Sequence, residues 1–326
     1  MQKTIVAFGE IMLRLTPPEN GFIREADSFS ACYGGSESNV LVCLSALGNA
    51  TRFLTAVPQG ELGQAVCRHL RAYGVGTGEI LQTGDTLGMY FLEEGFGKRP
   101  AQVIYNRRHS AVTTLSEDAF DYDRVFADCG LFHICGISFA LSASCRALAF
   151  RLMQEARKRN IPVSFDFNYR AKLWTVEEAA AVYREIMKYV DIVFCSARDL
   201  SAFLDTNVHR FFDVYSPSHL VVREREVREG GRQAVLASFY RKKAGCIEEV
   251  RVDKTEFPVL ERIGAGDAFV GGVLHVLCRD FEDIQGALAF GVACFVLKHT
   301  VRGDVFALSE DAVQAYLSDV AKDVSR

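Results

Sequence analysis

The segment Arg262–Gly272 carries the residues best suited to chemistry in this chain of 326 residues. It reads Arg-Ile-Gly-Ala-Gly-Asp-Ala-Phe-Val-Gly-Gly, and an apolar helical run follows it. Gly264 and Gly266, separated by Ala265, let backbone N–H groups approach an anion, and a helix starting there adds about half a positive charge. Asp267 would repel a bound phosphate, so its carboxylate makes more sense as a base that deprotonates an alcohol attacking the phosphate. The structural alternative is a tight glycine turn with Asp267 as a helix cap.

Short β-rich runs alternate with longer helical patterns along the chain. Residues 161–166 form a compact apolar run, and the capping-box spacing of Thr175 and Glu178 opens a helix that reaches about Tyr189. Residues 191–195 then form another apolar strand. This βαβ rhythm is typical of a parallel sheet covered on both faces, in which ligands gather beyond the carboxyl ends of the strands. We therefore expect an α/β fold with a mostly parallel central sheet flanked by helices.

Two segments, residues 86–93 and 101–107, interrupt this rhythm. The glycines and the proline of residues 94–100 suit a turn, so we expect a hairpin that projects from the main sheet. Its apolar residues would expose one face unless the hairpin packs on the body or on a partner. The stretch Arg223–Arg232 alternates in charge and contains a Gly-Gly turn signal, which predicts a solvated loop or hairpin after Glu224.

The composition excludes several classes of function. Hydrophobic residues make up 49% of the chain and charged residues 24%, the balance of a soluble globular protein. The 37 basic and 41 acidic residues give a net charge of −4, so no global positive field attracts nucleic acid or an anionic membrane. No stretch approaches the roughly 20 apolar residues of a membrane helix, and the first nine residues read as a strand, so we expect a cytoplasmic protein. The ten cysteines contain no Cys-x-x-Cys pair, which indicates reduced thiols that fill the core.

The Gly-Ala-Gly-Asp sequence resembles the C-terminal signature of the ribokinase-like carbohydrate kinases, the PfkB family. The resemblance implies a single ribokinase-like α/β domain over residues 1–326, with a small β-sheet lid built from about 10–35 and 86–112. It implies that Asp267 is the catalytic base and also touches the substrate. The same resemblance assigns the anion hole, and with it the binding of the nucleotide phosphates, to residues 264–266.

Other landmarks follow in the order that the family has. Residues 33–40 resemble its N-terminal Gly-Gly-x-x-x-Asn element, and residues 298–304 resemble a segment near its nucleotide site. Where the family usually has Asp-Thr ahead of the glycines, this chain has Glu261 and Arg262. The resemblance implies that three residues of the N-terminal element touch sugar hydroxyls: Gly34, Gly35 and Asn39.

The resemblance also indicates a nucleotide side, with ATP and Mg²⁺ as the expected cofactors. After a core strand the family often has Asn-x-x-Glu, and this chain has Ser196-Ala-Arg-Asp199. The serine can donate a hydrogen bond to phosphate, and Asp199 can hold the metal through water. A helix N-cap is the structural alternative for Ser196. Asp166 and Asn168 suit either metal orientation or structural hydrogen bonds, and Arg223 matches a strand end that faces the triphosphate. The chain has no Walker Gly-x-x-x-x-Gly-Lys sequence, which excludes the P-loop class.

Four strings most resemble the 2-keto-3-deoxygluconate kinases of this family: residues 9–18, 105–111, 165–174 and 298–300. A sugar acid carries a carboxylate that arginine binds with two hydrogen bonds, and the resemblance places Arg107 and Arg170 at the substrate. Tyr90 and Tyr105 lie on the two hairpin strands, where one face would close over the ligand and exclude water. The structural alternatives are an exposed charge for Arg107, a salt bridge for Arg170 and a half-buried strand position for each tyrosine.

The expected reaction is the ATP-dependent phosphorylation of the terminal hydroxyl of 2-keto-3-deoxygluconate. Two alternatives stay open: a PfkB-type kinase for a neutral sugar such as fructose or ribose, and a catalytically silent sugar-binding or regulatory protein on the same fold. A Rossmann dehydrogenase is disfavoured because the glycine cluster Gly74–Gly78 follows a helical pattern rather than a strand. Related kinases often pair their lids, so we expect a homodimer through the β lid and small molecules as the other partners.

Overall fold

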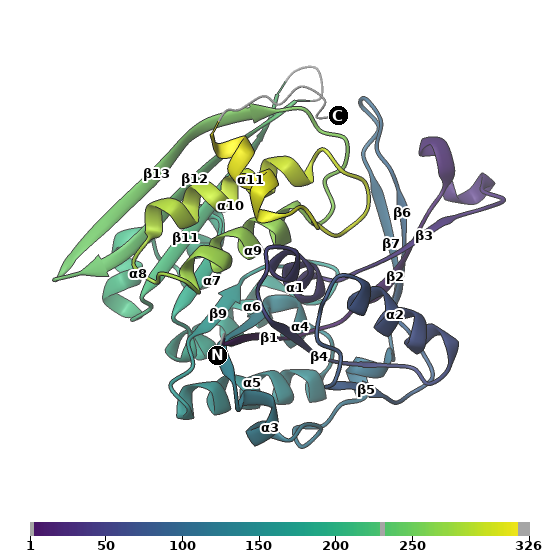
Figure 1. The fold of residues 1–326 in the computed structure, drawn as a ribbon, viewed down its shortest axis with the longest axis horizontal. Helices are drawn as coiled ribbons and strands as arrows, with labels where there is room; N and C mark the ends of the chain where they lie inside the picture. Colours follow the sequence, from purple (N-terminus) through teal and green to yellow (C-terminus); the bar gives the residue numbers. More distant parts are fainter. Residues whose placement is uncertain (1–2, 229–231, 319–326) are drawn as a thin grey trace.

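A twisted, mostly parallel sheet forms the centre of the protein (Figure 1). The computed structural model describes residues 3–228 and 232–318. Within them the central sheet has nine strands, in the order β13-β12-β11-β10-β9-β8-β1-β4-β5. The pairs from β11 to β5 are parallel, whereas β12 and β13 add an antiparallel edge. In chain order the strands are β1 (Thr4–Phe8), β4 (Thr51–Val57), β5 (Ile80–Gln82), β8 (Cys129–Cys135), β9 (Val163–Asp166), β10 (Ile192–Cys195), β11 (His219–Val227), β12 (Gln233–Lys243) and β13 (Cys246–Phe257).

Helices cover both faces of this sheet, which explains why its central strands are continuous apolar runs. All five residues of β1 and all four of β10 are buried. One apolar core joins the sheet to α3 (Tyr122–Phe126), α4 (Gly136–Ala140), α5 (Ala143–Lys158), α6 (Val176–Ile186), α7 (Ala197–Leu204) and α8 (Val208–Val214). A second core joins the other face to α1 (Ser36–Ala46), α2 (Glu61–Ala72), α9 (Ala265–Leu277) and α10 (Ile284–Lys298). The helix α11 (Glu310–Leu317) packs on α10.

A separate four-stranded sheet, which we call the lid, projects beside the main body (Figure 1). Its order is β3-β2-β6-β7, where β2 and β6 run parallel and the outer pairs are antiparallel. On its inner face Met12, Tyr90 and Leu92 are buried and pack against Ile263, the residue just before the Gly264 turn. The lid therefore contacts the anion-hole segment directly. Its strands are β2 (Met12–Thr16), β3 (Ser30–Gly34), β6 (Met89–Glu93) and β7 (Gln102–Asn106).

The local predictions agree with the structure at several points. Thr175 and Glu178 form the capping box that opens α6. The two segments predicted as a hairpin pair in antiparallel register as β6 and β7. The charged stretch after Glu224 continues β11 as one arm of a hairpin with β12. The predicted Gly-Gly turn at residues 230–231 lies outside the described residues.

The cysteines are all free, and seven of the ten are buried. The prediction of core-filling thiols is wrong for Cys246 and Cys278, which are exposed. Cys246 begins the edge strand β13, and Cys278 follows the last residue of α9, so neither position faces a packed layer. Among the helices that the structure describes, none combines the length and apolar composition needed to cross a membrane.

Candidate active site

A cavity of about 540 Å³ lies at the carboxyl ends of β9 and β10, between the lid and the start of α9. This is the edge at which parallel α/β sheets bind ligands. The cavity contains every residue that the sequence placed at a ligand site, although these residues come from widely separated segments. They are Gly34, Gly35, Asn39, Tyr90, Tyr105, Arg107, Arg170, Ser196, Asp199, Arg223, Gly264, Ala265, Gly266 and Asp267.

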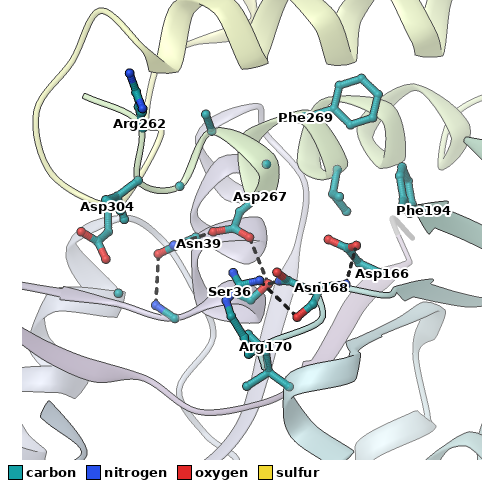
Figure 2. A pocket seen from close by; sticks show the side chains of 18 of the residues that line it. Ser36, Asn39, Asp166, Asn168, Arg170, Phe194, Arg262, Asp267, Phe269 and Asp304 are labelled. Carbon is teal, nitrogen blue, oxygen red and sulfur yellow. Dashed lines mark hydrogen bonds between the residues drawn. The ribbon is translucent and has the colours of Figure 1, made fainter. Parts of the chain in front are cut away.

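Asp267 lies in the first turn of α9 and is held by two side chains of α1 (Figure 2). Ser36 Oγ donates to one carboxylate oxygen at 3.0 Å, and Asn39 Nδ2 donates to the other at 2.7 Å. Asn168 Nδ2 in turn donates to Ser36 Oγ at 2.7 Å. Burial raises the pKa of Asp267, and the hydrogen bonds from Asn39 and Ser36 oppose that shift. The carboxylate is thus fixed in direction while its proton affinity is increased, as a general base requires.

The turn before Asp267 needs glycine for both conformation and space. Gly264 has φ of 77°, in the left-handed region, and is the N-cap of α9. A Cβ on Gly264 would lie 1.8 Å from the carbonyl oxygen of Asp304. At Gly266 a Cβ would lie 3.2 Å from Arg223 Nη2, so the glycine lets this arginine come close. Because the first N–H groups of a helix have no partner within it, this turn can bind an anion.

Arg223 supplies a partly buried positive charge beside the anion hole. Its guanidinium lies 5.4 Å from the ring centre of Phe269 and 4.6 Å from that of Phe295. Within the described part of the chain it forms no ion pair within 4.0 Å. Burial lowers the pKa of Arg223, and the charge of Asp166 raises it. A cation held by aromatic faces and without a close carboxylate suits a phosphate ligand.

Ser196 and Asp199 form a capping box at the start of α7, so the structural alternative for Ser196 is realised. Asp199 Oδ2 accepts from the backbone N–H of Ser196 at 2.7 Å and from its hydroxyl at 2.8 Å. The water-mediated metal contact of Asp199 stays a prediction. No three acidic, histidine or cysteine side chains among residues 3–228 and 232–318 gather closely enough to hold a metal ion directly.

The donor set nevertheless fits a hydrated Mg²⁺, which keeps several waters and binds through one or two carboxylates. Asp166, at the end of β9, is partly buried near the charges of Asp267 and Asp199. Burial and these two carboxylates raise the pKa of Asp166 to about 7. A cation bound here would relieve that accumulation of negative charge. Asp166 and Asp199 are the residues that would hold it through water.

The raised pKa of Asp166 predicts a pH-dependent stability. Between about pH 4 and pH 7 the folded protein binds more protons at this group than the unfolded chain does. The contribution of Asp166 to the free energy of unfolding therefore falls as pH rises. Above about pH 7 its destabilising effect is complete. We expect Asp166→Asn to be more stable than the unaltered protein at pH 8, by a few kcal/mol at most, and this gain to shrink at pH 5. Urea unfolding in EDTA at both pH values measures the difference. An equal difference at pH 5 and pH 8 would contradict the assigned cause.

Arg107 is neither exposed nor free, because Glu10 binds it. Arg107 Nε donates to Glu10 Oε2 at 2.7 Å, and its Nη2 contacts the same oxygen. Ser110 Oγ donates to Glu10 Oε1 at 2.5 Å. Both members of the pair are at most 8% exposed. The predicted alternative of an exposed charge is therefore wrong, and Arg107 reaches the cavity as a neutralised, tightly oriented group.

Arg170 differs from Arg107 in having no carboxylate partner within 4.0 Å among the described residues. Its Nη1 donates only to the carbonyl oxygens of Asn168 and Tyr169, at 3.2 and 3.1 Å. The salt bridge considered as its structural alternative is thus absent from this part of the chain. Arg170 is a cation of the cavity without a close carboxylate partner, and Figure 2 shows it near Ser36 and Asn168. Its charge opposes the rise in the pKa of Asp267 and of Asp166.

The two lid tyrosines occupy different environments. Tyr90 is 5% exposed, and its hydroxyl donates to the carboxylate of Asp304. Tyr105 is half-buried on the neighbouring strand, with its ring centre 5.9 Å from that of Tyr90. The guanidinium of Arg107 lies 5.5 Å from the Tyr105 ring centre. Tyr105 therefore forms an aromatic wall of the cavity, whereas the polar end of Tyr90 already has a partner.

Three acidic residues at or behind the site were not predicted from the sequence: Glu10, Glu261 and Asp304. Glu10 follows β1 directly, so the rule that polar residues after strands mark the site would have found it. Arg14 Nη1 donates to Asp304 at 2.7 Å and Nη2 to Glu261 at 3.0 Å. Arg14 is 290 residues from Asp304 and 247 residues from Glu261 in the sequence, so no local pattern reveals these contacts. Glu261 thus belongs to a buried ion-pair cluster, while its neighbour Arg262 lines the cavity.

Comparison with known proteins identifies the class to which this fold and cavity belong. The profile of the pfkB family carbohydrate kinases matches residues 2–310. The crystal structure of a 2-dehydro-3-deoxygluconokinase from Thermotoga maritima superposes with a TM-score of 0.90 at 32% identity, covering 97% of this chain and all of that one. The chain is 34% identical to a 2-dehydro-3-deoxygalactonokinase of Haloferax volcanii over 97% of both proteins. It is 27% identical to a 2-dehydro-3-deoxygluconokinase of Bacillus subtilis, over 98% of this chain and 96% of that protein.

The chain therefore belongs to the PfkB family of carbohydrate kinases, and its fold is ribokinase-like. The family and fold expected from the Gly-Ala-Gly-Asp sequence are confirmed. The protein is an enzyme that phosphorylates a carbohydrate, and kinases of this family use ATP.

Proposed function

We propose that this kinase transfers the γ-phosphoryl group of ATP to the terminal hydroxyl of 2-keto-3-deoxygluconate. The observation that carries the proposal is the joint placement of Asp267, the Gly264 turn and Arg170 around one cavity. A base, an anion hole and an uncompensated cation are what the phosphorylation of a sugar acid requires. The relatives named for 2-dehydro-3-deoxy sugar acids support the choice of substrate class.

In the proposed reaction Asp267 accepts the proton of the terminal hydroxyl as the sugar oxygen attacks the γ-phosphorus. The new oxygen–phosphorus bond forms while the bond from the γ-phosphorus to the bridging oxygen breaks, and ADP leaves with the bond's electron pair. The backbone N–H groups of the Gly264 turn and the start of α9 stabilise the negative charge on the phosphoryl oxygens. Asn39 and Ser36 keep the carboxylate aimed at the hydroxyl. Bound Mg²⁺ would neutralise part of the charge on the ATP phosphates.

The sugar acid would lie between the lid and α1, with its hydroxyls near Gly34, Gly35 and Asn39. Arg170 would bind the carboxylate, because among the described residues no carboxylate lies within 4.0 Å of its positive charge. Arg107 would add an N–H donor whose direction Glu10 fixes. Closure of the lid over this end excludes water, which protects the phosphoryl group from hydrolysis.

A panel of substrates tests the proposal, with ADP formation as the readout. It includes 2-keto-3-deoxygluconate, its C4 epimer 2-keto-3-deoxygalactonate, and the neutral sugars fructose and ribose. We expect the highest kcat/KM for 2-keto-3-deoxygluconate. A preference for fructose or ribose refutes the sugar-acid assignment, and a preference for the epimer moves the assignment to the galactonate. Sugar binding without any ADP formation supports the catalytically silent alternative.

We further propose that two copies of the chain associate through the outer face of the lid. Leu15 and Phe91 on this face are only partly buried, and Ile104 is 51% exposed. A second lid would cover this apolar surface. Sedimentation should give twice the chain mass of 36.2 kDa, and Ile104→Asp should shift the protein to a single chain mass. Sedimentation of the unaltered protein as one chain contradicts the dimer.

A further inference from the structure

Lys298, the last residue of α10, is a fully buried cation that the proposed reaction does not yet use. Its exposed fraction is 0%. The ammonium donates to the carbonyl oxygen of Val301 at 3.3 Å, and no carboxylate of the described residues lies within 4.0 Å of it. An ammonium has three N–H donors, so this group is incompletely satisfied for a charge removed from water. Such a costly arrangement calls for a compensating role.

The position of Lys298 relates it to the anion hole. Its Cε lies 3.4 Å from the point that a Cβ on Gly264 would occupy. The lysine side chain therefore lies beside the turn that we propose as the anion hole. The carbonyl oxygen of Asp304 also lies so close to Gly264 that it leaves no room for a Cβ. Lys298 and Asp304 thus both lie against the Gly264 turn.

Lys298 also completes the charge balance of the buried cluster behind the turn. Arg14 binds Asp304 and Glu261, and these three residues are 3 to 6% exposed. Two carboxylates thus face one guanidinium, and the second positive charge is that of Lys298. Burial lowers the pKa of Lys298 from its usual value, and the charges of Glu261 and Asp304 partly oppose that shift.

The remaining charges around this cluster do not change the balance. Glu94 lies 3.6 Å from Arg14 and 3.6 Å from Arg302, so the rim contributes one further carboxylate and one further cation. The negative charge of Asp267, which lines the cavity, also opposes the lowering of the pKa of Lys298. With Lys298 charged, the cluster behind the turn is neutral; without that charge it carries one net negative charge.

We propose that Lys298 is a positioning residue for phosphoryl transfer, whose ammonium neutralises the Glu261–Asp304 pair and so keeps the Gly264 turn able to stabilise an anion. The proposal rests on the proposed phosphoryl transfer and deepens it. A net negative charge behind the turn would oppose the charge that develops on the phosphoryl oxygens. That opposition acts most strongly in the transition state, so it lowers kcat more than it raises the KM for the sugar.

Lys298→Met tests the proposal because methionine keeps much of the length and removes the charge. Measured with the sugar that the unaltered enzyme phosphorylates fastest, kcat should fall by about 10- to 100-fold, the scale of a lost electrostatic contribution in a buried site, while the KM for the sugar stays within about threefold. The exposed Lys188→Met serves as the matched control and should keep the unaltered kcat.

The double variant Lys298→Met with Glu261→Gln separates charge balance from packing. It removes one positive and one negative charge, so it should recover most of the lost kcat. It also contains no uncompensated buried charge, which makes it the variant to measure if Lys298→Met alone does not fold. A double variant that folds but stays as slow as Lys298→Met, or slower, overturns the proposal.

The outcomes distinguish this inference from the proposed function. If the unaltered protein forms no ADP with any sugar of the panel, the proposed phosphoryl transfer fails and this role fails with it. If the unaltered protein is active and Lys298→Met keeps kcat within twofold, only the role of Lys298 is refuted. A large rise in the KM for the sugar at unchanged kcat also refutes it, because that pattern indicates a ground-state contact.

Discussion

Replacing Asp267 by asparagine should lower kcat by at least about 10²-fold, the usual scale for loss of a general base. Asparagine has nearly the same shape but accepts no proton. Its amide oxygen can still accept the hydrogen bond from Asn39, so the start of α9 should keep its position. Affinities for ATP and the sugar acid should therefore change little. Steady-state kinetics gives kcat, and isothermal titration calorimetry gives the two affinities.

The control for this variant is Asp213→Asn, the same chemical change at an exposed aspartate of α8. It should leave kcat unchanged. A turnover of Asp267→Asn close to that of the unaltered enzyme would show that another group takes the proton. If affinity for the sugar acid fell as far as kcat, Asp267 would act mainly as a binding residue. The arrangement with Ser36 and Asn39 favours a large loss of kcat with little loss of affinity, because both donors hold the carboxylate without neutralising it.

Local patterns were enough to predict the elements that surround the site. The capping box of Thr175 and Glu178 depends on two residues three positions apart, and the structure forms it as expected. The glycine turn and the start of α9 likewise follow from the Gly264–Asp267 sequence alone. The capping box of Ser196 and Asp199 has the same three-residue spacing and was predictable by the same rule.

The charge state of the site was not predictable, because it depends on pairs that only the fold brings together. The sequence places Arg107 at the substrate, but it does not reveal that Glu10, 97 residues earlier, binds this arginine. The sequence places Tyr90 on a hairpin face that closes over the ligand, but it does not reveal that the Tyr90 hydroxyl donates to Asp304, 214 residues later. Each local pattern identifies a residue type at a strand end. Whether that residue keeps its charge for a ligand depends on a distant partner, and this difference separates Arg107 from Arg170.

Arg170 is for this reason the better test of carboxylate recognition. Arg170→Ala should raise the KM for the sugar acid by about 10- to 100-fold, the scale of one or two hydrogen bonds to a charged group. The KM for ATP should stay within about threefold. Arg170 donates hydrogen bonds only to backbone carbonyls, so its removal breaks no ion pair and should not unfold the protein. Steady-state kinetics with each substrate varied in turn measures both effects, and the exposed Arg157→Ala is the control.

Arg107→Ala should also weaken the sugar acid more than ATP, but with a second effect that Arg170→Ala lacks. It leaves Glu10 buried and unpaired, which costs about 3–5 kcal/mol of stability and places a negative charge near the substrate carboxylate. Thermal unfolding should therefore separate the two variants, with Arg107→Ala clearly less stable. The combination Arg107→Met with Glu10→Gln removes both charges and isolates the contribution of the arginine to sugar-acid binding. Equal losses of affinity for sugar acid and ATP in Arg170→Ala would argue against carboxylate recognition, because a phosphate-binding role would affect the nucleotide as strongly as the sugar.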